Sequence, residues 1–398
     1  NTLIGGSAGD ALTDADGNTA IGLNALTTDT LGSKSTAVGQ SALALQNFTT
    51  ATDTYNTAVG FEAGVSITTG QFNNLFGGNT GDALTDGAAN VAMGYTALTS
   101  DTRGSNSTAI GHGALGTQNF TTATSAYNTA VGSNAGGAVT TGVENTIVGG
   151  LAGDAITSGA SNVAIGVSAL SAHTIGNKTV AIGNQALSVQ NYATETDSFN
   201  VAVGFQAGVA VTTGVRNALL GALAGDALTD ADHNIAVGFA ALSSDTQGSR
   251  AVAVGQSALL AQNFTTATDN YNVAVGYFAG GSVTTGTSNT IMGGLAGDAM
   301  TTGDNNTFLG FQAAGGGTVT GGQNTAVGTT AAFSLTDGDN NTLLGFDAGR
   351  TGSPGGQLTT GNNQIFLGDE NVVAIYAAVS SISTSDERDK TDFTDLDL

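Results

Sequence analysis

The chain has 398 residues, with 61 glycines, one proline, no cysteine and a formal net charge of −23. Only eight residues are basic, and they are scattered, which argues against nucleic acid and against an anionic membrane surface as partners. No apolar run approaches the roughly 18 residues of a membrane span, so we expect no membrane insertion. Without cysteine, disulfides and thiolate chemistry are excluded.

A short repeat runs through almost the whole sequence. Its unit is Asn, then three apolar or β-branched residues, then Gly, as in residues 18–22 and 200–204. The Gly stands at positions 5, 22, 39, 60 and 77, so one interval in four is longer than the others, and the same spacing then starts again. Four units therefore make one module, and the modules begin at Asn1, Asn73, Asn145, Asn217 and Asn289.

Each unit is typical of one coil of a β-solenoid: a short strand, a Gly corner, a second apolar segment and a polar turn. Helix is disfavoured because β-branched residues and glycines fill the repeat. A series of unlinked hairpins is the weaker alternative, since paired two-residue turn signals are missing. We therefore predict an all-β, parallel β-solenoid (a β-roll or β-helix) of 17–21-residue coils. Stacking at about 4.8 Å a coil gives a rod on the order of 100 Å long.

The strand of the repeat is apolar on both faces, which requires cover on both sides. We expect one face to fill the coil interior. The other face, lined by alanines, should allow close approach by a second chain. Because coils this short bury little core, we predict a homo-oligomer of chains packed side by side, with a trimer as the leading expectation.

Two polar patterns predict structure rather than chemistry. Asn begins 16 of the 21 repeats, and stacked amides can form a hydrogen-bonded ladder along a rod. Residues 14–18, 230–234 and 337–341 resemble the opening of a calcium loop, but the later bidentate acid is absent. Asx-turns account for these aspartates, so we expect no metal and no cofactor.

The 21-residue coils carry a four-residue insertion that brings two aromatic residues with it. Insertions in solenoids lie in loops on one face, often the binding face. Aromatic rings beside Asn and Gln suit stacking and hydrogen bonding to sugars. The alternative is that the rings pack between chains and lock the oligomer. The candidate binding residues are Phe48, Tyr55, Phe120, Tyr127, Tyr192, Phe199, Phe264 and Tyr271.

The repeats resemble those of phage tail fibres and, more loosely, the heads of trimeric autotransporter adhesins. After the last repeat, residues 383–393 look like the start of the intramolecular chaperone of endosialidase-type phage fibres. In that family the chaperone trimerises the fibre and then cuts itself off. The resemblance implies Ser385 as the nucleophile and Lys390 as its base, in the full-length precursor only. Phe393 stands where the family carries Ile, and the sequence stops at Leu398, well short of a full chaperone domain.

These patterns predict three segments: a solenoid shaft over residues 1–368 in five modules, the last irregular; a neck strand over 369–384; and the start of the chaperone over 385–398. Because the sequence opens in mid-pattern without Met, we interpret it as a fragment. The predicted function is a non-enzymatic, adhesive fibre shaft on a virion, which binds a glycan or protein receptor on a host cell. The alternative is a bacterial surface adhesin or extracellular filament. An enzyme acting on polysaccharide would need a carboxylate cluster that breaks the symmetry of the modules.

Overall fold

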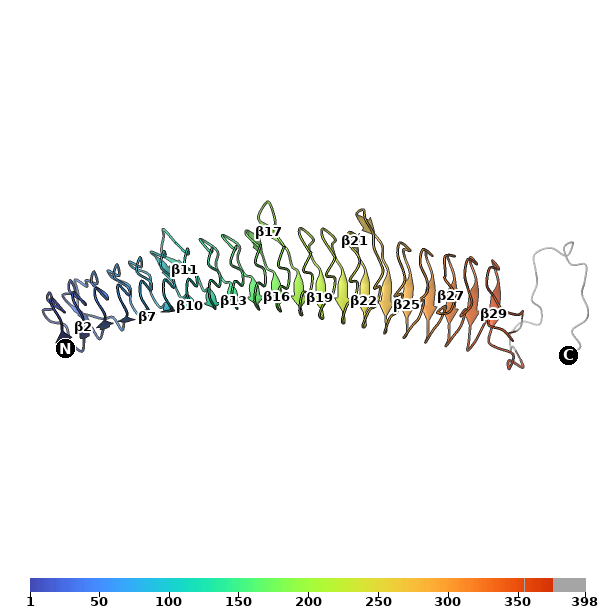
Figure 1. Cartoon of the computed structure of the whole chain (residues 1–398), viewed down its shortest axis with the longest axis horizontal. Helices are drawn as coiled ribbons and strands as arrows, with labels where there is room; N and C mark the ends of the chain where they lie inside the picture. The colour runs from blue at the N-terminus through green and yellow to red at the C-terminus, as the bar shows by residue number, and fades with distance from the viewer. Residues whose placement is uncertain (354, 375–398) are drawn as a thin grey trace, which may run out of the picture.

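The computed structural model describes residues 1–353 and 355–374. The chain forms a gently curved rod of stacked coils, which run in sequence order from one end to the other (Figure 1). Every regular element in the described part is a β-strand. The predicted parallel β-solenoid is therefore confirmed.

Each coil contributes one three-residue strand to a single sheet of 21 strands that runs along the rod. We call it the long sheet. Its strands are β1 (Thr2–Ile4), β2 (Thr19–Ile21), β4 (Thr36–Val38), β6 (Thr57–Val59), β7 (Asn74–Phe76), β8 (Val91–Met93), β10 (Thr108–Ile110), β12 (Thr129–Val131), β13 (Thr146–Val148), β14 (Val163–Ile165), β16 (Val180–Ile182), β18 (Val201–Val203), β19 (Ala218–Leu220), β20 (Ile235–Val237), β22 (Val252–Val254), β24 (Val273–Val275), β25 (Thr290–Met292), β26 (Thr307–Leu309), β27 (Thr325–Val327), β28 (Thr342–Leu344) and β29 (Ile365–Leu367).

The strands pair in parallel, each with the equivalent strand of the next coil. Ala20 lies opposite Ala37, and across the longer 21-residue interval Ala37 lies opposite Ala58. The register therefore absorbs the insertions, which leave the coil as loops. Equivalent positions of the repeat sit one above another along one axis, as the sequence predicts.

The side on which the alanines lie was predicted wrongly. The middle residue of each strand, usually Ala, points into the coil and is fully buried in the case of Ala20, while its neighbours Thr19 and Ile21 point outward and are half-buried. The reason is volume. In a 17-residue coil the opposite wall already sends a leucine such as Leu26 into the interior, so the strand has room only for a methyl group.

Once in each of the first four modules, and in four coils of the fifth, the strand carries a large residue in place of Ala. The strand of β7 carries Leu75, which is fully buried, and the opposite wall then carries Gly64 and Gly81. A methyl group on Gly64 would lie 2.8 Å from Leu75 Cδ1, closer than two carbon atoms approach each other. The core is thus one continuous column that keeps its density from coil to coil.

The predicted asparagine ladder is confirmed, although it runs mainly through the backbone. Asn73 illustrates the pattern: its amide nitrogen donates to Gly87 O at 2.9 Å, within its own coil. Its side-chain oxygen accepts from the backbone N–H of Asn90 in the next coil at 3.0 Å. Each such side chain, itself fully buried, closes one coil and joins it to the next.

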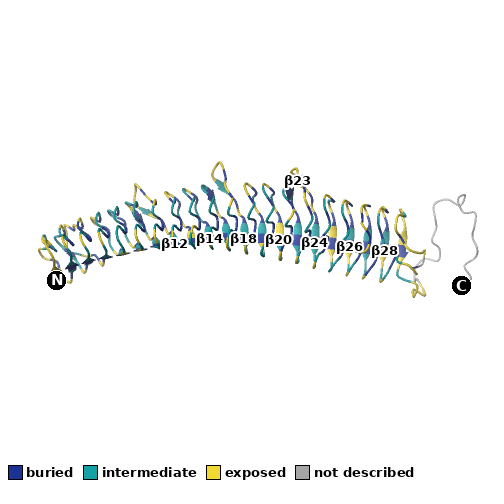
Figure 2. Ribbon diagram, in the orientation of Figure 1, coloured by how far each residue is buried: buried dark blue, intermediate teal, exposed yellow. Residues whose placement is uncertain are grey.

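The insertions form four small parallel sheets away from the long sheet. In Figure 1 they rise from the side of the rod opposite the long sheet, and in Figure 2 their tips are exposed. We call this side the insert edge. Its strands are β3 (Gly32–Ser33) with β5 (Thr52–Asp53), β9 (Gly104–Ser105) with β11 (Thr124–Ser125), β15 (Gly176–Asn177) with β17 (Thr196–Asp197), and β21 (Gly248–Ser249) with β23 (Thr268–Asp269).

Candidate functional site

The first aromatic residue of each insertion is buried within its own chain. Phe48, Phe120, Tyr192 and Phe264 are only 5–7% exposed. They can neither bind a receptor nor lock one chain to another, so both sequence-based interpretations of these four residues are wrong. Their rings cover a polar cluster inside the coil, which the pattern of aromatic residues alone does not reveal.

That polar cluster centres on a fully buried carboxylate in three of the four insertions. In the second module Asp101 Oδ2 accepts a hydrogen bond from Gln118 Nε2 at 2.6 Å. Asp101 Oδ1 accepts from the backbone N–H of Gly104 at 2.9 Å and of Phe120 at 3.3 Å. Gln118 Oε1 in turn accepts from Asn128 Nδ2 at 2.8 Å. The cluster therefore fixes where the insertion leaves and rejoins the coil.

The third module replaces this cluster with an uncharged one. His173 stands in the place of the aspartate and Tyr192 in the place of the phenylalanine, with their rings edge to face at 6.0 Å. His173 Nε2 lies 2.8 Å from Gly176 O, and the Tyr192 hydroxyl donates to Gly214 O at 3.0 Å. Burial lowers the pKa of His173 and raises the pKa of Tyr192 to about 12. Both side chains are therefore neutral in the folded chain at neutral pH.

The buried histidine gives a testable pH dependence. Its pKa is lower in the folded than in the unfolded chain, where it is about 6.5. The free energy of unfolding therefore does not depend on this histidine above pH 6.5. As the pH falls from 6.5 toward the folded pKa, the free energy of unfolding decreases by about 1.4 kcal/mol per pH unit. We expect His173→Gln, which keeps a donor for Gly176 O but does not titrate, to remove this part of the acid sensitivity. Unfolding measured from pH 7.5 to 4.5 checks this; parallel curves for the two proteins would contradict it.

The second aromatic residue of each insertion is exposed, in contrast to the first. Tyr55, Tyr127, Phe199 and Tyr271 are 49–59% exposed, and all four have positive φ angles near +50°. Tyr55 stacks on Phe72 of the next coil, with ring centroids 5.9 Å apart. These four side chains remain candidates for contact with a receptor.

A basic residue lies against three of these four rings. The Lys34 ammonium lies 5.0 Å from the Tyr55 ring centre, and Lys178 and Arg250 lie similarly against Phe199 and Tyr271. Each base also pairs with an aspartate in the insertion, such as Asp53 beside Lys34. The hydrogen bond to Asp53 raises the pKa of Lys34 to about 12. Cation–π contacts of this kind hold an exposed ring in one orientation.

The insert edge also gathers most of the positive charge in the described part of the chain. Of the basic residues there, only Arg350 lies away from this edge. The five others are Lys34, Arg103, Lys178, Arg216 and Arg250. Four of these five bases pair with an aspartate, so they offset negative charge locally on a chain of net charge −23.

The outer face of the long sheet is a second candidate surface, formed by the residues on either side of the buried middle residue of each strand. No residue in the 21 strands is charged. Val203 and Ile182 are half-buried, and Leu220, Ile235 and Met93 are 41–47% exposed. The third residue of every strand is large and apolar, whereas the first residue is threonine in eleven strands. A continuous apolar row of this length is unusual on a soluble monomer.

Two further features of the sequence are the acidic side chains considered as metal ligands and the self-cleavage pair near the end of the sequence. Within residues 1–353 and 355–374 no group of three or more His, Asp or Glu side chains is placed to hold a metal ion. The same part of the chain contains no helix that could cross a membrane. The predicted self-cleavage pair, Ser385 and Lys390, lies outside the described residues, as does most of the predicted neck strand.

No model of a known protein family matches this chain, and no curated protein matches it.

Proposed function

We propose that the chain is the shaft of a homotrimeric, non-enzymatic fibre that attaches to a cell surface, as a phage tail fibre does. In this proposal three copies lie side by side, with the outer faces of their long sheets turned toward a common axis. The insert edges then face outward, where a glycan or protein receptor on a host cell can reach them.

The observation that carries this proposal is the uncharged outer face of the long sheet. Parallel sheets are covered on both faces, but here only the inner face is covered by the chain itself. A net charge of −23 makes copies of the chain repel one another wherever acidic side chains meet. The outer face is the surface along which copies can approach without that repulsion, and its half-buried valines and isoleucines supply apolar area to bury.

Attachment is proposed for the insert edge because its exposed rings recur in every insertion. Equivalent rings lie four coils apart, which is about 19 Å along the axis. Three chains would multiply the set, so weak individual contacts would add up to firm attachment.

The attachment proposal is tested by changing the four exposed rings together. In the variant Tyr55→Asn, Tyr127→Asn, Phe199→Asn and Tyr271→Asn, the fold is retained because asparagine occupies the equivalent position at Asn106 and Asn340, also with positive φ. We expect binding of the fluorescently labelled rod to a panel of bacterial strains to fall by at least about tenfold.

The matched control is Phe239→Asn, since Phe239 is 53% exposed but lies on the corner after β20 and not on the insert edge. It should bind cells as the unchanged rod does. Equal binding by the fourfold variant, or an equal loss in the control, would contradict attachment through the insert edge.

A further inference from the structure

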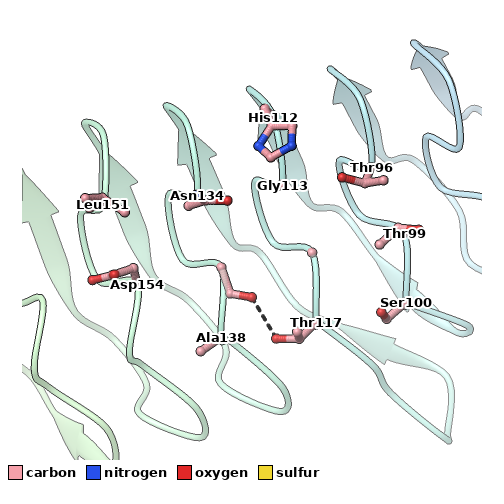
Figure 3. A pocket seen from close by; sticks show the side chains of 12 residues that line it. Thr96, Thr99, Ser100, His112, Gly113, Thr117, Asn134, Ala138, Leu151 and Asp154 are labelled. Carbon is pink, nitrogen blue, oxygen red and sulfur yellow. Dashed lines mark hydrogen bonds between the residues drawn. The ribbon is translucent and has the colours of Figure 1, made fainter.

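A hollow of about 580 Å³ interrupts the side of the rod, across the second module and the first coil of the third. It crosses the coils that contain β8, β10, β12 and β13 (Figure 3). We call it the module-2 groove. Its lining includes His112, Thr117, Asn134, Leu151, Thr99 and Ser100.

Three glycines in the lining distinguish the module-2 groove from the rest of the repeat. They are Gly113, Gly116 and Gly137, and no other module carries glycine at all three positions. A methyl group on Gly113 would lie 2.5 Å from the Asn134 side-chain oxygen. The glycine therefore lets the Asn134 amide lie across the groove. At these three positions the second module differs from the other modules.

The walls of the module-2 groove combine a flat ring with small hydroxyl groups. His112 is exposed and stacks on Tyr95 of the preceding coil, with ring centroids 5.9 Å apart and planes inclined by 18°. Thr117, Thr99 and Ser100 add hydroxyls to the lining (Figure 3). The Thr117 hydroxyl donates to Gly137 O at 2.8 Å and the Thr99 hydroxyl donates to Asp82, so these two can only accept from a ligand. A stacked ring beside hydroxyl and amide groups suits a ligand that has apolar ring faces and many hydroxyls of its own.

The charges at the module-2 groove favour an uncharged ligand. The one carboxylate in its lining is Asp154, and the lining contains no lysine or arginine. Arg103, the basic residue of this module, pairs with Asp86 at the insert edge. An anionic ligand would meet the field of a strongly acidic rod without a cation to bind it.

We propose that the module-2 groove binds a short stretch of a neutral polysaccharide. The sugar rings lie along the rod axis, one of them against His112. Their hydroxyls exchange hydrogen bonds with the Asn134 amide and donate to the Thr117 and Thr99 hydroxyl oxygens. This site goes beyond the attachment proposed for the insert edge, because it rests on the geometry of this one groove and not on the recurring aromatic rings.

The test uses substitutions that the chain itself supplies. His112→Gln, Gly116→Leu and Gly137→Val install the residues that stand at the equivalent positions of other modules, namely Gln40, Leu260 and Val65. The combined variant should therefore fold while its groove is filled. His112→Gln alone removes only the ring and serves as a second variant if the combined one does not fold.

The probes are maltohexaose, cellohexaose and chitohexaose, with hexagalacturonate as a charged probe.

Saturation-transfer NMR on the full chain should show binding of at least one neutral probe. The combined variant should weaken that binding by at least about tenfold and His112→Gln by a smaller factor, while the fourfold insert-edge variant binds the probe unchanged. The proposal is overturned if no neutral probe binds, if only hexagalacturonate binds, or if the groove variants bind as the unchanged chain does. If the fourfold insert-edge variant loses cell attachment but still binds the probe, the groove is a saccharide site separate from the insert edge.

Discussion

Replacing Gly149 with alanine is expected to open the solenoid locally, whereas the same change at the adjacent Gly150 is expected to have almost no effect. Gly149 forms the corner after β13 with a φ of +136°, a conformation that residues with a side chain rarely adopt. An added methyl group would lie 2.6 Å from Gly166 O in the next coil. Backbone strain and this clash together should cost about 3 kcal/mol.

Gly150 provides a matched control one residue away. A methyl group there would meet nothing within 4 Å, and its φ is not positive. Hydrogen exchange followed by mass spectrometry, on peptides that cover residues 145–170, reports the local stability of the two variants. Faster exchange in Gly149→Ala alone is the expected result. Equal protection in both variants would show that the stacked glycine corners do not hold the coils together.

Replacing Gln118 with leucine is expected to destabilise the second module strongly. Asp101 would lose its hydrogen bond from Gln118 Nε2 while remaining fully buried, and Asn128 Nδ2 would lose its acceptor Gln118 Oε1. Leaving a buried carboxylate short of a donor costs about 3 kcal/mol. The variant should unfold at a clearly lower urea concentration, as followed by circular dichroism.

The control for this change is Asn119→Leu, at the next residue. Asn119 is exposed, and its side-chain oxygen accepts a single hydrogen bond, from Thr102 Oγ1 at 3.0 Å. Its loss should shift stability by no more than about 0.5 kcal/mol. If Gln118→Leu is as stable as Asn119→Leu, the polar cluster does not fix the insertion in the coil.

The solenoid itself could be predicted from the sequence because its period is local and repeats many times. The orientation of the strand could not. Alternation shows that Ala20 and its neighbours lie on opposite faces, but the face that turns inward depends on the volume of the opposite wall. A usable signal was present, because coils with Leu75 or Ile147 in the strand have Gly81 or Gly153 opposite, and coils with Ala20 have Leu26.

The insertions show a similar division. That they form loops on one side followed from the longer interval in the repeat, and Tyr55 is exposed there. Phe48 is the same type of residue in the same insertion, yet it is buried, and its backbone N–H donates to the buried Asp29. The signal for that cluster was the pair Asp29 and Gln46, one coil apart, which recurs in the next module as Asp101 and Gln118. The module-2 groove could be found only when glycines from two coils were seen side by side.

The mass of the chain in solution tests the central claim most directly, measured by light scattering for the unchanged chain and for Val203→Lys. Val203 lies on the outer face of the long sheet, in β18. Thr194→Lys, at the exposed tip of an insertion, is the control of equal charge. We predict three times the mass of one chain for the unchanged protein and for Thr194→Lys, and a lower average mass for Val203→Lys, because a buried unpaired charge weakens the contact. A single-chain mass for the unchanged protein, or a trimer that survives Val203→Lys, would contradict the proposal that three shafts pack through this face.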